Sequence, residues 1–243
     1  MNAFEDSHRC RIVYEKEDDL SLGRYSRIFL LSPANLAGIR AGYITRADSQ
    51  LDLACRLRKH GVPLGELFSF VSGLYFRGKL AYAQTFSPLP PVASATFIIT
   101  ATAGLVSPET VVTLHRLREI SANDIDPRDR RYRMPLERDC RRLSEMMADS
   151  CDVVLLGSIA TSKYVEPLLH IFRERLLFPA EFVGRGDMSR GGLMLRCVDS
   201  GNELAYISVL NAARRGKRPP KLLPFITLRN KTSEAPKPSG ETR

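Results

Sequence analysis

Short apolar runs alternate with longer amphipathic stretches through the middle of the chain. Arg27–Leu31 (RIFLL), Thr96–Ala101 (TFIITA) and Cys151–Leu156 (CDVVLL) have the length and composition of buried strands, and we expect a fourth strand at Arg175–Phe178. Strands this short and this apolar are typical of a parallel sheet that is covered on both faces. The pattern therefore predicts an α/β fold with a mostly parallel sheet and flanking helices.

Helical periodicity accounts for most of the sequence between these strands. The predicted helices are Asp48–His60, Leu64–Gln84, Thr113–Ile120, Pro135–Asp149 and one that begins within the stretch Leu155–Tyr164 and continues through Glu166–Phe172. The second of them contains Gly65, Gly73 and Gly78, each of which costs about 1 kcal/mol relative to alanine in a helix. We expect each of these glycines to mark a bend or a close helix crossing.

The region after Pro179 allows two interpretations. The segment FVGRGDMSRGG is rich enough in glycine to predict a loop, followed by Leu193–Val198 and Glu203–Val209 as the strands of a C-terminal β-hairpin. A helix that starts at Met188 is the alternative for the first of these two strands.

These elements predict a single α/β domain over residues 25–213. Residues 1–24 are acidic and lack periodicity, which predicts a flexible lead-in with one short strand at Arg11–Tyr14. Ser87–Ser94 (SPLPPVAS) is a loop by composition. Residues 214–243 form a basic tail that we expect to be disordered.

The formal net charge of +9 is concentrated at the C-terminal end. Nine Lys and Arg residues stand against two Glu from Arg214 onward, and the cluster RRGKRPPK at Arg214–Lys221 suits contacts with nucleic-acid phosphates. A tail that only aids solubility explains it equally well. Arg128–Arg142 holds seven arginines against three acids, which favours a solvated helix face with ion pairs over a second nucleic-acid patch.

Composition argues against several classes of protein. No run approaches the roughly 18 apolar residues that cross a bilayer, and the N-terminus is polar, so we expect a cytoplasmic protein without a membrane partner. The five cysteines stand far apart without a CxxC pair, and the four histidines have no metal-binding spacing. We therefore expect no disulfide framework, no metal and no cofactor.

Polar residues gather directly after the first three predicted strands. Ligands usually bind at the edge of a parallel sheet where the carboxyl ends of its strands meet. The residues concerned are Ser32, Asn35 and Arg40 after the first strand, Gly104 after the second, and Gly157, Ser158, Thr161, Ser162, Lys163 and Tyr164 after the third. Together they suit a phosphate or carboxylate, although helix capping alone explains each hydroxyl. The spacing is not that of a P-loop, because Ser162 stands where a glycine is required.

The segment GRGDMSRGG adds a fourth polar loop. Arg185 and Arg190 suit the clamping of an anion, and Asp187 suits acid–base chemistry or the binding of a sugar hydroxyl. The alternative is that Asp187 pairs with an arginine and only orders the loop.

The segments SPAN at Ser32, TATAGLVSPET, LLGSIATSKY and FPAEFVGRGDMSRGG together resemble a family of uncharacterised bacterial proteins over most of Arg27–Leu222. More distantly, their order is similar to that in the peroxide-stress proteins that carry SPAK after their first strand. That resemblance implies DNA binding and protection during oxidative stress. Asn35 replaces the lysine of SPAK, so the role of that lysine does not transfer. Enzymes that modify 7-deazaguanine bases contain related domains, but the cysteine and lysine of their motif are absent here.

The leading hypothesis is an enzyme that binds a phosphorylated or nucleoside-like substrate, either free or within nucleic acid. In it Asp187 and Lys163 are the catalytic residues, Lys163 and Arg190 hold the anion, and the other polar residues of the four loops orient the substrate. The alternative is a non-catalytic nucleic-acid-binding protein that uses the basic helix and the tail.

Overall fold

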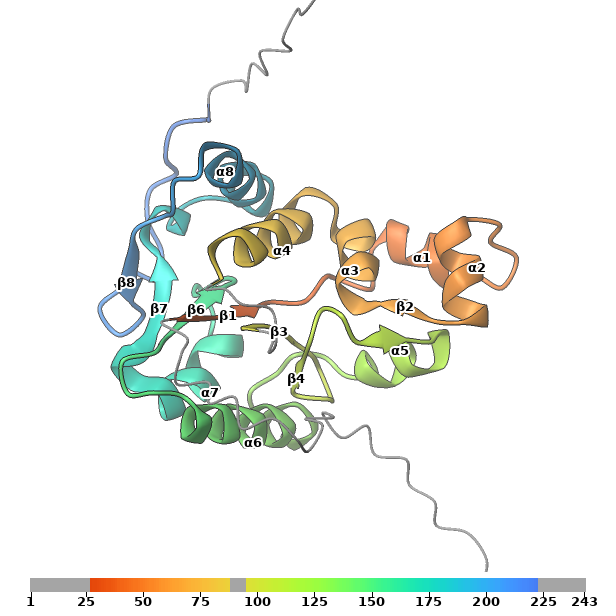
Figure 1. The fold of residues 1–243 in the computed structure, drawn as a ribbon, viewed down its shortest axis with the longest axis horizontal. Helices are drawn as coiled ribbons and strands as arrows, with labels where there is room; N and C mark the ends of the chain where they lie inside the picture. The colour runs from red at the N-terminus through yellow and green to blue at the C-terminus, as the bar shows by residue number, and fades with distance from the viewer. Residues whose placement is uncertain (1–26, 88–94, 223–243) are drawn as a thin grey trace, which may run out of the picture.

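A six-stranded sheet of order β4-β3-β1-β6-β7-β8 forms the centre of the molecule (Figure 1). This computed structural model describes residues 27–87 and 95–222. The inner strands are parallel and the two edge strands are antiparallel to their neighbours, as the sequence predicted for a mostly parallel sheet. The strands are β1 (Arg27–Leu31), β3 (Thr96–Ile99), β4 (Leu105–Val106), β6 (Asp152–Leu156), β7 (Leu176–Pro179) and β8 (Tyr206–Ser208).

Helices cover both faces of this sheet, which gives three layers (Figure 1). On one face lie α4 (Leu74–Phe86) and α8 (Asp187–Ser200), and on the other lie α6 (Arg130–Met146) and α7 (Ser162–Phe172). All four predicted main strands are buried or nearly so because helices pack on both sides of them. The prediction of an α/β fold with flanking helices is confirmed.

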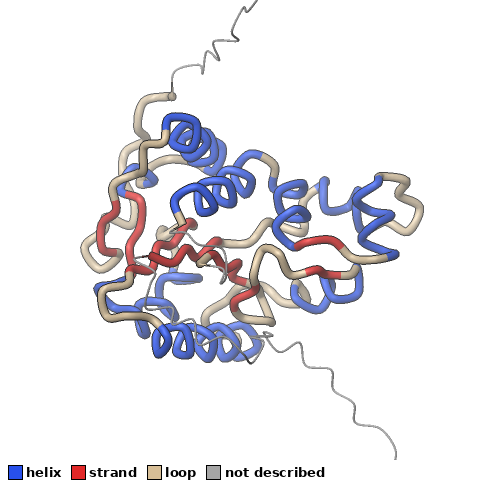
Figure 2. The backbone as a smooth tube through the Cα atoms, viewed as in Figure 1, coloured by secondary structure: helices blue, strands red, loops and turns tan. Residues whose placement is uncertain are grey.

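Shorter elements extend the molecule to one side (Figure 2). They are α1 (Ile39–Thr45), α2 (Asp52–Lys59), α3 (Leu64–Ser72), α5 (Leu114–Ile120) and the antiparallel pair β2 (Val62–Pro63) and β5 (Val111–Val112). The short 3₁₀ helices η2 (Arg173–Arg175) and η3 (Ala180–Phe182) flank β7. Buried apolar residues of this side and of the sheet belong to one continuous core.

The helix predicted over Leu64–Gln84 is divided at Gly73 into α3 and α4. Gly73 has φ +61°, and a Cβ there would lie 2.6 Å from a guanidinium nitrogen of Arg40. A side chain would therefore meet backbone strain, and the flexible end of the Arg40 side chain would have to move. The expected bend is present at this glycine.

The charged helix α6 begins at Arg130, five residues before the predicted start at Pro135. Asp129 caps it by accepting a hydrogen bond from the backbone N–H of Arg131 at 2.8 Å. Pro135 lies inside the helix. The predicted boundary was wrong because proline is common in the first turn of a helix, whereas the capping acid lies further upstream.

The segment GRGDMSRGG does not stay a loop, because α8 begins at Asp187. The helical alternative is confirmed, and the prediction of a strand at Leu193–Val198 was wrong. The C-terminal antiparallel pair is still present, since Tyr206 of β8 lies opposite Pro179 of β7. The predicted strand at Arg11–Tyr14 and most of the predicted loop Ser87–Ser94 lie outside the described residues.

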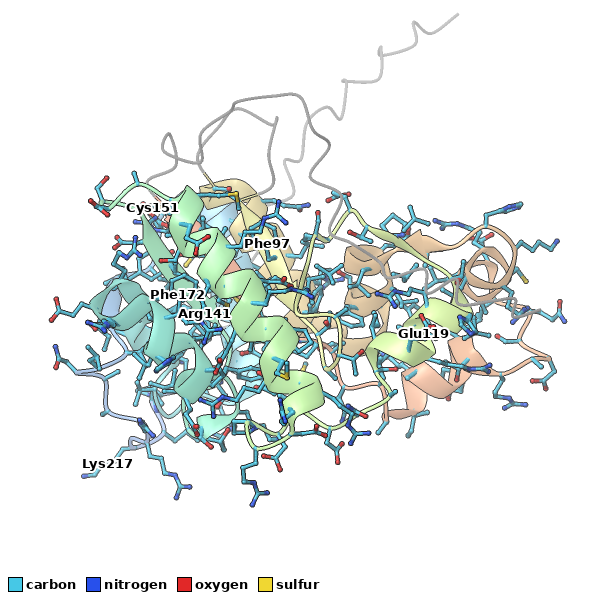
Figure 3. All side chains as sticks on the ribbon, turned by 90° about the horizontal axis from the view of Figure 1, so that it is seen from below. Phe97, Glu119, Arg141, Cys151, Phe172 and Lys217 are labelled. Carbon is cyan, nitrogen blue, oxygen red and sulfur yellow. The ribbon has the colours of Figure 1, made fainter. Side chains whose placement is uncertain are left out.

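The described part of the basic tail packs on the start of α8. The backbone of Lys217 is in contact with Gly184, and Arg185 donates a hydrogen bond to the carbonyl of Pro220 at 3.4 Å. Lys217 itself projects from the edge of the molecule (Figure 3). Within the described residues, no helix has the length and apolar character needed to span a membrane.

Candidate functional site

Ser32 directly follows β1 and lies at the carboxyl edge of the sheet. Its backbone N–H donates to the carbonyl of Leu156, the last residue of the neighbouring strand β6. Gly157 comes next, and a Cβ on this glycine would lie 3.1 Å from Cβ of Ser32. The absence of a side chain at Gly157 therefore leaves room for Ser32, as expected for two loops at one sheet edge.

Lys79, a residue that the sequence analysis did not select, lies against Ser32. Its side chain comes from α4 and is only 1% exposed. The Nζ atom donates to the backbone carbonyl of Ser32 and lies 2.8 Å from the Oγ atom of the same residue. The rings of Tyr75 and Phe76 flank the amine, with centroids 4.5 and 5.0 Å from Nζ.

The ionisation of Lys79 is strongly perturbed. Burial lowers its pKa to about 7, because the charged form loses its hydration. Asp187 opposes this effect and Arg190 adds to it, but both contributions are smaller than that of burial. No carboxylate within the described residues forms an ion pair with Lys79. A substantial fraction of this amine is therefore neutral near pH 7.

Tyr75 carries a buried hydroxyl that makes no hydrogen bond of ordinary geometry in the described part of the chain, although Arg190 and Ser32 lie close to it. Burial raises its pKa to about 12. The charge of Arg190 opposes this effect and that of Asp187 adds to it, and weak hydrogen bonding from Arg190 and Ser32 also lowers the pKa. An unsatisfied buried hydroxyl costs about 1–3 kcal/mol. Such a group calls for an explanation, and a ligand that supplies the missing partner is one.

Arg190 lies beside this hydroxyl and is itself only 8% exposed. Its Nε and Nη2 atoms donate to the carbonyl of Phe182 at 3.2 and 3.0 Å. The Nη1 atom faces the carboxylate of Asp187 at 3.9 Å, and the Asp187 side chain is 69% exposed. The guanidinium is thus held by the backbone, while its remaining edge has only a loose, solvent-exposed ion pair.

A close crossing of α4 and α8 brings these residues together. A Cβ at Gly78 would lie 2.8 Å from the carbonyl oxygen of Gly191, and a Cβ at Gly191 would lie 2.7 Å from that of Leu74. The two helices therefore touch backbone to backbone. This contact holds Arg190, next to Gly191, over the helix that carries Tyr75 and Lys79.

Tyr164, at the start of α7, belongs to the same electrostatic environment. Burial raises its pKa, and Tyr75 and Asp187 add to the increase. We refer to Ser32, Tyr75, Lys79, Tyr164, Asp187 and Arg190 as the edge cluster. Four of its six members, Ser32, Tyr164, Asp187 and Arg190, are residues that the sequence analysis selected.

Lys163 and Gly104 lie away from the edge cluster. Lys163 is exposed, and its backbone carbonyl accepts a hydrogen bond from the Tyr132 hydroxyl at 2.8 Å. A hydrogen bond from Arg128 holds the pKa of Asp126 at about 2, and the charge of Lys163 contributes to this, so the amine faces the α6 side. Gly104 has φ +69° and its α-carbon faces the carboxylate of Asp139 on α6.

Several other predicted residues hold their own loops together. The Oδ1 atom of Asn35 accepts from the N–H of Ala37 at 2.9 Å, and Ser158 Oγ accepts from the N–H of Ala160 at 3.3 Å. Arg40 donates to the carbonyl of Phe70 at 3.4 Å. These contacts are those of turn and loop residues.

Arg185 and the two residues that open α7 also lie outside the edge cluster. Arg185 donates to the carbonyl of Glu181 at 3.0 Å and to Ser189 Oγ at 3.3 Å. Thr161 is the N-cap of α7, but its side chain makes no capping hydrogen bond. Ser162 lines a shallow pocket of about 560 Å³ between α6 and α7.

One of the two arginines that line that pocket is already paired with acids. Arg133 lines it, but its guanidinium already donates to Glu137 at 2.6 Å and to Glu166 at 2.7 Å. His170 and Arg214 complete its polar lining. Among the described residues, no three His, Cys, Asp or Glu side chains are grouped so as to hold a metal ion.

Arginines of α6 are largely neutralised by neighbouring acids. Arg131 pairs with Asp129, Arg138 with Asp139, and Arg141 with Glu137. Figure 3 views the molecule from the side of this helix. These contacts agree with the interpretation of the segment as a solvated face with ion pairs. Within the described ranges, by contrast, the cations of Arg214–Lys221 form no ion pair.

A sequence signal for Lys79 did exist. Tyr75, Lys79 and Tyr82 follow helical spacing and share the buried side of α4, so the lysine interrupts an apolar stripe. A charged residue at such a position is rarely buried without a partner. Its partner, Ser32, is 47 residues away in the chain, and only the fold brings the two together.

No family model matches the chain, and neither a curated protein nor a solved structure matches it in the corresponding searches.

Proposed function

We propose that the protein is an enzyme that acts on a phosphorylated or nucleoside-like substrate at the edge cluster. The observation that carries this proposal is the Tyr75 hydroxyl, which is buried beside Arg190 and Ser32 and makes no hydrogen bond of ordinary geometry among the described residues. A phosphate or carboxylate oxygen would accept hydrogen bonds from both side chains. The cluster also lies at the carboxyl edge of β1 and β6, where ligands of open α/β sheets usually bind.

Asp187, the acid of the edge cluster, would contact another part of the same substrate. Asp187 forms a loose contact of 3.9 Å with Arg190, and its side chain is largely exposed. An incoming anion would compete with this carboxylate for the guanidinium, which frees Asp187 to accept a hydrogen bond from a sugar hydroxyl or a base. Lys163, in contrast, would act at most from outside the cluster.

A ligand titration followed by NMR tests the proposal. Uniformly ¹⁵N-labelled protein would be titrated with inorganic phosphate and with a panel of nucleoside 5′-monophosphates. We expect saturable chemical-shift changes at Ser32, Gly157, Arg190 and the start of α8. Changes confined to α6, α2 or the pocket at Ser162 would contradict the proposal, as would the absence of any saturable change.

Nucleic-acid binding without catalysis is the second candidate function. The observation in its favour is the segment Arg214–Lys221, which carries five cations and no acid. Within the described part of the chain these cations have no ion-pair partner, whereas Arg131, Arg138 and Arg141 of α6 do. The tail segment, rather than α6, is therefore the better match to a phosphate backbone.

Charge neutralisation at the two places separates their contributions. Arg214, Arg215, Lys217, Arg218 and Lys221 would each be changed to Gln in one variant. Arg128→Gln combined with Arg131→Gln serves as the control. We expect the first variant to weaken DNA or RNA binding and to flatten its salt dependence by about one unit of log–log slope per lost phosphate contact, and the second to change little. Equal effects of the two variants would contradict this assignment.

A further inference from the structure

The contact between Lys79 and Ser32 has the form of a nucleophile and its base. A neutral amine has two N–H donors and one lone pair. Here the amine donates to the backbone carbonyl of Ser32 and, at 2.8 Å, to the Oγ atom of the same residue, while the Ser32 hydroxyl donates to the carbonyl of Leu156 at 3.4 Å. For the lone pair of the neutral amine to accept the proton of the hydroxyl, the hydroxyl must turn from the Leu156 carbonyl toward Nζ, over a distance of 2.8 Å between Oγ and Nζ.

The surroundings of Lys79 stabilise an ammonium only in part, through two oxygen atoms of Ser32 and the faces of two aromatic rings. A buried ammonium ordinarily pairs with a carboxylate, and no carboxylate in the described residues is in hydrogen-bonding contact with Nζ. The charged groups that face it are Asp187 and Arg190 of α8, which act in opposite directions. The phenol of Tyr75 lies beside it on its own helix.

We propose that Ser32 is a catalytic nucleophile and Lys79 its general base, and that together they cleave a carboxylic ester or amide carried by an anionic substrate. This inference rests on the proposed function, because Arg190 and Tyr75 of the same cluster would hold the anion. Pairs of serine and lysine serve this purpose on unrelated folds, so the chemistry depends on the geometry rather than on the fold.

The reaction consumes one water molecule. Ser32 Oγ attacks the carbonyl carbon while its proton passes to Lys79 Nζ, and the bond from carbon to the leaving oxygen or nitrogen then breaks. The leaving group takes the proton from Lys79, and the acyl group remains on Ser32 as an ester. Water then attacks this ester, Lys79 accepts a proton from the water, and Ser32 Oγ leaves and regains that proton.

Covalent labelling with an alkyl fluorophosphonate tests this pair. In the full-length protein we expect one adduct, on Ser32 by peptide mapping, with a labelling rate that increases between pH 6 and 8 as Lys79 becomes neutral. Ser32→Ala would remove the adduct, and Lys79→Met would slow labelling by about 100-fold. Ser200→Ala and Lys59→Met, two changes far from the edge cluster, should label like the natural protein.

A structural role for Lys79 predicts a different result. Lys79→Arg keeps a hydrogen-bond donor and a charge but has no neutral form near pH 7. If Lys79 only supports the carbonyl of Ser32, this variant would label at nearly the normal rate, and such a result would overturn the inference. So would the absence of an adduct on Ser32 in the natural protein.

The same samples distinguish this inference from the proposed function. Phosphate binding at the edge cluster without labelling of Ser32 would refute the nucleophile–base pair and leave the proposed function intact. Labelling of Ser32 in a protein that binds neither phosphate nor a nucleoside monophosphate would refute the anionic substrate instead.

Discussion

Gly78 and Gly191 place the backbones of α4 and α8 in direct contact. A Cβ on Gly78 would lie 2.8 Å from the carbonyl oxygen of Gly191. Because Lys79 follows the first glycine and Arg190 precedes the second, this crossing sets the distance between the amine and the guanidinium. The geometry of the edge cluster therefore depends on two residues that have no chemistry of their own.

Replacement of Gly191 by alanine should damage both stability and ligand binding. Its Cβ would lie 2.7 Å from the backbone oxygen of Leu74, and this overpacking should lower the free energy of unfolding by about 2–3 kcal/mol. Gly192→Ala is the matched control, since the nearest atom to its Cβ is a methyl carbon of Leu222 at 3.7 Å. Urea unfolding of both variants measures the difference. Equal stability of the two would contradict the crossing.

The pKa of Lys79 predicts an unusual dependence of stability on pH. The folded-state pKa of about 7 lies below the ordinary value of 10.5, so the unfolded chain binds more protons between these two values. Stability therefore rises with pH across this window, and the contribution of Lys79 is least favourable below pH 7. Between pH 7 and 9 we expect the free energy of unfolding to rise by about 2 kcal/mol relative to that of Lys79→Met.

Guanidinium chloride unfolding at several pH values checks this result. The comparison with Lys79→Met cancels the titration of all other groups that the two proteins share. A difference between them that stays constant from pH 6 to 9 would mean that Lys79 titrates at its ordinary pKa in the folded protein.

Gly104 should prove to be a structural residue. Its positive φ of +69° and its contact with the Asp139 carboxylate leave no place for a side chain. We expect Gly104→Ala to cost about 2–4 kcal/mol of stability and to leave phosphate affinity unchanged in the protein that remains folded. Gly42→Ala provides the control, because no atom lies within 4 Å of its Cβ. A weaker phosphate affinity of Gly104→Ala without a loss of stability would mean that Gly104 belongs to the binding site.

The parts of the fold that were predictable from the sequence are those that depend on local pattern. The strand Arg27–Leu31 was predicted at its observed bounds, because a continuous apolar run followed by Ser-Pro leaves little choice. Ser32 and Gly157 were expected at the same edge, since their strands are parallel neighbours in the sheet. Arg190 was selected from a glycine-rich segment that turned out to start a helix.

Long-range packing explains what was not predicted. Gly191 was predicted to lie in a loop, because a single sequence does not show that Gly78 packs against it. Lys79 interrupts the apolar stripe of its helix, but its contact with Ser32 depends on the fold. Lys163 was selected because it follows β6, but its backbone lies against α6, where its carbonyl accepts a hydrogen bond from the Tyr132 hydroxyl.

Replacement of Tyr75 by phenylalanine is the most direct measurement of the central claim, that the edge cluster binds an anion. The change removes only the hydroxyl, which makes no hydrogen bond of ordinary geometry among the described residues. We predict that the free energy of unfolding stays unchanged or increases by up to about 1 kcal/mol. We also predict that calorimetry shows an affinity for phosphate or a nucleoside monophosphate at least about tenfold weaker. Unchanged affinity, or a clear loss of stability, would contradict it.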